Sequence, residues 1–131
     1  MANLKHVVSL CAIAALMPSG PAPASERWTQ DHDTCNQQST TYDIATCIDT
    51  RAKLWDQRLN QAYRQVLTML QDEPARAAAL RAAQRSWLRY RDDNCAFYQT
   101  ETGTIRMIEV AACHRDMTQD RAIELQREGP H

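Results

Sequence analysis

Hydrophobic side chains recur at steps of three and four between residue 41 and about residue 71. This spacing places them on one face of a helix. Thr40 or Thr41 can cap its start, and a turn at residues 72–74 ends it, because the residue before proline is disfavoured in the α region. We therefore predict a long amphipathic helix. Its apolar face carries Ile44, Ile48, Ala52, Trp55, Leu59, Ala62, Tyr63, Val66 and Leu70.

A second stripe follows over residues 74–98, where Pro74 suits the first turn of a helix. The connection to the preceding helix is short, which predicts an antiparallel hairpin. The residues on or near this second stripe are Leu80, Ala83, Trp87, Leu88, Arg91, Cys95 and Tyr98.

The third pattern, after a turn at residues 100–104, is weaker, and we expect a final helical region with a break near Cys113. It carries Ile105, Ile108, Ala112, Met117, Ala122 and Leu125, and Gly129-Pro130 ends it. The two long helices cannot bury their stripes on each other alone, so the final helix and the polar lead-in at residues 25–40 must cover them. The pattern predicts an all-α fold, a small antiparallel helical bundle built on a long helical hairpin.

Composition agrees with helix, since the chain has 3 Gly and 1 Phe but many Ala, Leu, Gln and Arg. A length of 131 residues suits one domain. Lys and Arg total 15 against 16 Asp and Glu, a formal net charge of -1. This balance argues against non-specific binding to nucleic acid, which requires a basic protein.

The first 24 residues have the three parts of a secretory signal. Lys5 precedes an apolar run at residues 7–17, and Ala22-Pro23-Ala24 forms a small-x-small cleavage site. The run is shorter than the roughly 20 residues that span a bilayer. We predict a signal peptide at 1–24 and a periplasmic or secreted helical domain at 25–131, with no membrane span in the mature form. A lipoprotein is not expected, because Cys11 lies inside the apolar run after Leu10.

Removal of the signal leaves Cys35, Cys47, Cys95 and Cys113, an even number that is typical of disulfides in a short exported chain. Three pairings are possible. Pairing of sequence neighbours, Cys35–Cys47 and Cys95–Cys113, closes two short loops and suits the helix layout. A metal site is the alternative, because His32 and His114 lie near cysteines. The chain lacks a compact CxxC pair, so we expect disulfides and no metal or cofactor.

Two blocks of the sequence carry a recognisable motif: residues 59–63, Leu-Asn-Gln-Ala-Tyr, and residues 84–95, Gln-Arg-Ser-Trp-Leu-Arg-Tyr-Arg-Asp-Asp-Asn-Cys. They resemble the bacterial family of the lysozyme inhibitor LprI N-terminal-like domain. The paired cysteines, the Thr102-Gly103-Thr104 turn, and Thr118, Arg121 and Leu125 extend the resemblance over about residues 35–125. The turn departs from the family, which often has a Gly-Gly-Ser-like sequence there. The resemblance implies an exported helical domain, with lysozyme inhibition assigned to the namesake.

We expect the family-motif side chains to be structural. A buried contact is the favoured role for Asn60, and core packing is favoured over a sugar-binding platform for Tyr63 and Trp87. Arg91 faces inward and needs a carboxylate partner, for which Asp43, Asp49 and Asp56 are the candidates. The motif residues are Leu59, Asn60, Tyr63, Gln84, Trp87, Arg91, Asp92 and Arg121.

Arg81, Arg85 and Arg89 repeat every four residues and so form a basic ridge on the second helix. The ridge and the turn at Gly103 and Thr104 are candidate partner-binding features, although such a ridge can also be a solvated face. Neither serine nor free cysteine is placed with histidine and an acid as a nucleophilic system requires, so we predict no enzyme and no catalytic residue. The sequence favours an exported envelope binding protein, and the family resemblance implies an inhibitor of lysozyme or a related cell-wall hydrolase. The alternatives are a structural or assembly adaptor of the periplasm and a small peptidoglycan hydrolase.

Overall fold

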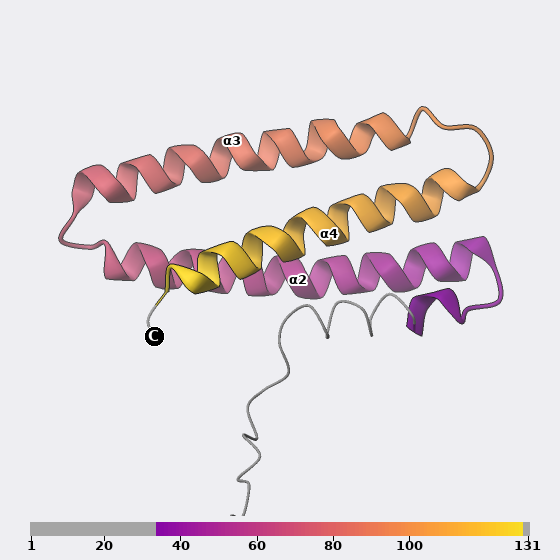
Figure 1. Cartoon of the computed structure of the whole chain (residues 1–131), viewed down its shortest axis with the longest axis horizontal. Helices are drawn as coiled ribbons and strands as arrows, with labels where there is room; N and C mark the ends of the chain where they lie inside the picture. Colours follow the sequence, from indigo (N-terminus) through magenta and orange to yellow (C-terminus); the bar gives the residue numbers. More distant parts are fainter. Residues whose placement is uncertain (1–33, 130–131) are drawn as a thin grey trace, which may run out of the picture.

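The structure, a computed structural model, describes residues 34–129, and the predicted signal peptide lies outside them. Three long helices make up most of the described chain: α2 (Thr41–Met69), α3 (Pro74–Tyr98) and α4 (Ile105–Arg127). Figure 1 shows α2 and α3 running antiparallel, joined by a short turn, while α4 returns alongside α2. The prediction of an all-α antiparallel bundle is confirmed.

Helix α2 begins where the sequence predicts, because Thr40 caps it. The Thr40 Oγ1 accepts a hydrogen bond from the backbone N–H of Asp43 at 3.0 Å, which satisfies one of the free donors of the first turn. The predicted apolar face is the buried face, with Ile48 and Leu59 each 1% exposed. Helix α2 therefore supplies the larger part of the core.

The closest helix pair is α2 with α4. Their shared core joins Trp55, Leu59 and Ala62 of α2 to Ala122 and Leu125 of α4. Ala62 is 1% exposed and Ala122 is fully buried, so small side chains allow the two helices to approach closely.

Helix α3 lies at the edge of this core. Its buried residues are Ala77, Gln84 and Cys95, and Leu80 and Trp87 pack against the core from its rim. The predicted stripe on α3 is therefore only partly covered, and Leu88 remains 36% exposed. The antiparallel hairpin is present, but its second helix rests mainly on α4.

Helix α4 is continuous through Cys113, so the break expected there is wrong. The sequence pattern was weak because the buried face of α4 includes the polar residues Arg115, Thr118 and Gln119. A buried polar residue interrupts hydrophobic periodicity without breaking the backbone helix.

Two disulfides join the described elements, and their pairing confirms the prediction. Cys35–Cys47 attaches a helical turn at residues 34–36 to α2, with a Cα–Cα distance of 5.5 Å. Cys95–Cys113 ties the end of α3 to α4, with a Cα–Cα distance of 5.6 Å. Within residues 34–129, no helix is both long and apolar enough to span a membrane.

Candidate functional site

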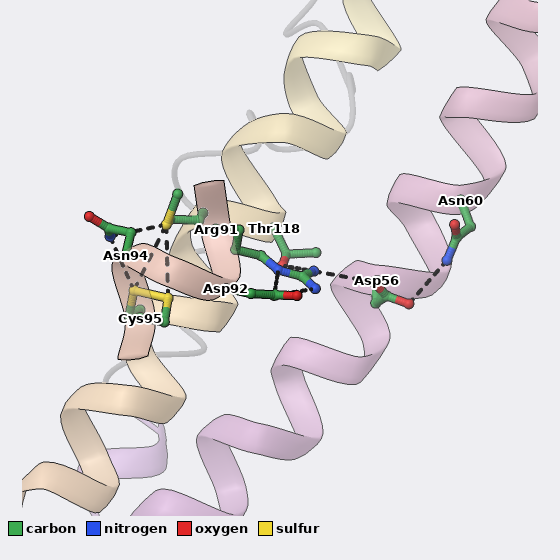
Figure 2. Close-up of polar contacts among 9 residues, drawn as sticks. Asp56, Asn60, Arg91, Asp92, Asn94, Cys95 and Thr118 are labelled. Carbon is green, nitrogen blue, oxygen red and sulfur yellow. Dashed lines mark hydrogen bonds and ion pairs between the residues drawn. A yellow bond between two sulfur atoms is a disulfide. The ribbon is translucent and has the colours of Figure 1, made fainter. Parts of the chain in front are cut away.

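One arginine connects the three long helices (Figure 2). Arg91 of α3 is 15% exposed, and its Nε donates to Asp92 Oδ1 at 3.0 Å. Its Nη1 donates to Thr118 Oγ1 of α4 at 3.3 Å and lies 3.6 Å from Asp56 Oδ1 of α2. The guanidinium also lies over the Trp87 ring, 5.3 Å from the ring centre. Arg91 thus binds one of the three carboxylates expected from the sequence and links the helices.

Asp56 is shared between Arg91 and Asn60, which stands one turn further along α2 (Figure 2). The Asn60 Nδ2 donates to Asp56 Oδ2 at 3.0 Å. Asn60 is exposed, so the expected buried contact is wrong: the side chain sits at the edge of the apolar face and turns along the helix surface. The four-residue spacing of Asp56 and Asn60 is a signal that sequence reasoning missed.

A second polar link joins α3 to α4 through two more residues of the family motif. Arg121 Nε donates to Gln84 Oε1 at 3.1 Å, and Arg121 Nη1 pairs with Glu124 at 2.7 Å. Gln84 is 7% exposed, so this contact lies at the helix interface. Gln84 and Arg121 therefore hold α3 against α4 in the middle of the bundle.

The third link surrounds the Cys95–Cys113 disulfide (Figure 2). Asn94 Nδ2 donates to Met117 Sδ at 3.3 Å and to Cys113 Sγ at 3.5 Å. Sulfur atoms are weak acceptors, so these contacts orient side chains more than they contribute energy. The family motif on α3 thus makes interhelical contacts along most of its length.

The arginines of the predicted ridge behave differently. Arg81, Arg85 and Arg89 are all exposed, and within residues 34–129 none of them forms an ion pair or a side-chain hydrogen bond. Arg91 and Arg121, by contrast, are bound to carboxylates. In the part of the chain that the structure describes, the ridge is therefore a positive surface without carboxylate partners.

Part of the ridge borders a hollow between α2 and α3. The hollow has a volume of about 230 Å³, and Arg81 and Arg85 lie on its wall. Asn60, Tyr63 and Gln84 of the family motif line it as well. The structure therefore brings together two groups of residues that the sequence assigned to separate roles.

The Gly103 turn lies elsewhere. Arg85 precedes the end of α3 at Tyr98 by about 20 Å of helix, at about 1.5 Å per residue. Gly103 has φ of 80°, in the left-handed region that favours glycine, and a Cβ there would meet nothing within 4 Å. The ridge and the turn therefore do not form one compact site.

A larger groove, of about 670 Å³, lies near the start of α4, and the sequence did not predict it. Tyr42 and Asp49 of α2 line it together with Arg106, Met107 and His114 of α4. Tyr42 is 65% exposed and Met107 37% exposed, so the groove has an apolar rim.

Two observations on the described residues concern acid–base and metal chemistry. Burial raises the pKa of Asp120, and the charge of Asp116 one turn earlier raises it further, but Asp120 lies on the α4 surface outside the hollow and the groove. In residues 34–129, no group of three or more histidine, cysteine, aspartate or glutamate side chains is placed to hold a metal ion.

The described residues define a small disulfide-linked helical domain in which paired motif residues hold the helices together and an unpaired basic ridge faces outward. The chain belongs to the family of the lysozyme inhibitor LprI, whose sequence profile matches residues 32–125. A protein of Rhizobium meliloti (strain 1021) that carries no assigned function is 31% identical over 117 residues, covering 79% of this chain and 83% of that protein. No solved structure matches the chain significantly.

Proposed function

We propose that this protein is an exported envelope binder that inhibits a lysozyme-type cell-wall hydrolase. Family membership supports a protein partner of this kind. The two disulfides support an oxidising compartment, since such bonds persist outside the cytoplasm. Residues 1–24 would act as the signal peptide, cleaved after Ala24.

The unpaired ridge is the observation that carries the proposal. Lysozyme-type hydrolases cleave glycosidic bonds with a pair of carboxyl groups in an open cleft. Arginine presents a planar fork of donors that matches a carboxylate, and within residues 34–129 Arg81, Arg85 and Arg89 pair with no carboxylate. A helix that lays this ridge over the cleft would exclude the glycan substrate.

The test is a titration of the exported protein, purified from the periplasm, into a lysozyme that digests peptidoglycan. We expect the lytic rate to fall in proportion to the protein added until the two are equimolar. A sample with reduced disulfides should inhibit less. An unchanged lytic rate at micromolar protein would refute lysozyme inhibition and favour the adaptor function.

The role of the ridge is tested by charge reversal. The double variant Arg85→Glu, Arg89→Glu should require at least tenfold more protein for half-inhibition. Arg64→Glu is the matched control, because Arg64 is an exposed arginine of α2 outside the ridge. Equal inhibition by the double variant and the control would exclude the ridge.

A further inference from the structure

The hollow between α2 and α3 has an excess of hydrogen-bond donors. Arg81 and Arg85 contribute two guanidinium groups, Tyr63 carries a hydroxyl and Gln84 an amide. Leu59 and Leu88 supply apolar surface to the same wall. A concave site with a few convergent polar groups on apolar walls is the usual form of a specific binding pocket.

The carboxylate that lines the hollow, that of Asp56, already has two partners. Asp56 lines the hollow, but its Oδ2 accepts from Asn60 and its Oδ1 faces Arg91 at 3.6 Å. The carbonyl oxygen of Gln84 accepts from Arg121, which leaves the Nε2 donor as the free end of this amide.

Arg81 and Arg85 stand four residues apart on one helix, where like charges repel each other. Within the described chain neither arginine forms an ion pair with a carboxylate. Because the Asp56 carboxylate is engaged by Asn60 and Arg91, a ligand that supplies another carboxylate would relieve the repulsion.

The size of the hollow limits that ligand. Its volume of about 230 Å³ is below the roughly 300–1,000 Å³ of pockets that enclose a small molecule. A disaccharide does not fit, but one acidic side chain does. The partly enclosed wall also strengthens an arginine–carboxylate contact relative to open water.

We propose that this hollow is a socket for one carboxylate side chain, aspartate or glutamate, of the inhibited hydrolase. Arg81 and Arg85 bind the two carboxylate oxygens, and Tyr63 and Gln84 stand beside them as further donors. Arg89 lies outside the socket, so it contributes only long-range electrostatic attraction to the carboxylate. The identity of the partner rests on the proposed function. The binding of a carboxylate in the socket can be tested without that partner.

The first experiment uses blocked glutamate, N-acetylglutamate N-methylamide, as the probe. It is titrated into the isotope-labelled exported protein, and the side-chain N–H signals of arginine are followed by NMR. We expect saturable shifts at Arg81 and Arg85, smaller ones at Arg89, and none with blocked glutamine. Equal shifts with both probes, or larger shifts with an N-acetylglucosamine trimer, would overturn a carboxylate socket.

The second experiment measures lysozyme binding by the variants. The double variant Arg81→Gln, Arg85→Gln should raise the Kd at least tenfold, whereas Arg89→Gln should raise it less than threefold. Tyr63→Phe, which removes one hydroxyl, should raise it severalfold. Equal weakening by the double variant and Arg89→Gln would refute the socket and leave inhibition standing. Shifts with blocked glutamate but no lysozyme binding would refute lysozyme as partner and retain the socket.

Discussion

Arg91 shows how one side chain can hold three helices. Its guanidinium reaches Asp92 on its own helix, Thr118 on α4 and Asp56 on α2, and it lies over Trp87. A largely buried arginine is favourable only when such partners offset its desolvation. Among the described residues, the ridge arginines on the same helix have no such partners, so position on α3 separates structural from surface arginines.

Replacement of Arg91 should therefore destabilise the fold. Arg91→Ala removes hydrogen bonds to charged groups and the packing on Trp87, and we expect a loss of about 2 kcal/mol in the free energy of unfolding. Arg89→Ala, an exposed neighbour, should change it by less than about 0.5 kcal/mol. Guanidinium denaturation followed by circular dichroism measures both. Equal midpoints for the two variants would contradict the role assigned to Arg91.

Asp120 should make the thermal stability of the protein depend slightly on pH. Burial and then Asp116 raise the pKa of this carboxyl in the folded state, so folding disfavours its charged form. The resulting penalty is absent below the unfolded pKa and complete above the folded pKa. Asp120→Asn should raise the Tm at pH 7 by no more than about 2 °C, since water screens the group, and leave it unchanged at pH 3. Asp93→Asn, on the exposed face of α3, is the control; a rise at pH 3 but not at pH 7 would reverse the assignment.

At the scale of helices, the apolar stripe of α2 and the proline that starts α3 predicted the bounds of both helices well. Hydrophobic periodicity failed at α4, where Arg115, Thr118 and Gln119 occupy buried positions. Periodicity also could not show that α4, and not α3, packs closest to α2. That choice depends on small residues meeting across an interface, and the sequence does not state which faces meet.

The same limit applied to the candidate site: the sequence predicted the feature that belongs to one helix and not the features that depend on two. The ridge was visible from the four-residue spacing of Arg81, Arg85 and Arg89, because that spacing is a local property of one helix. The hollow was not visible, because it needs the register between α2 and α3. The groove near the start of α4 was missed because it needs the register between α2 and α4.

Because α2 and α4 approach closely, a larger side chain at position 122 should strongly lower the free energy of unfolding. Ala122→Leu adds volume to a position that is fully buried against α2, and we expect a loss of about 1–3 kcal/mol through overpacking. Ala82→Leu, at an exposed position of α3, should cost less than about 0.5 kcal/mol. Urea denaturation compares the two. A neutral Ala122→Leu would mean that the helices are further apart than described.

At the scale of the molecule, α3 is the helix most dependent on individual links. It buries few residues. Besides the packing of Ala77, Leu80 and Trp87, it is attached by the turn to α2, the Arg91 and Gln84 contacts, and the Cys95–Cys113 bond. The same helix carries the ridge. Its position relative to α2 also shapes the hollow, so anything that loosens α3 should weaken partner binding.

Removal of each disulfide in turn can separate the effect of the α3 position on binding from the effect of stability on binding. Their sequence separations are 12 and 18 residues, so chain entropy predicts a similar loss of about 3 kcal/mol when either is removed. Cys35→Ala, Cys47→Ala should leave lysozyme inhibition intact at a temperature where the variant is folded. Cys95→Ala, Cys113→Ala should weaken inhibition severalfold at the same folded fraction and speed hydrogen exchange in the second half of α3. The two variants lose a similar free energy of unfolding, but of the two disulfides only Cys95–Cys113 holds α3. Equal inhibition by both variants would therefore mean that the position of α3 does not control binding.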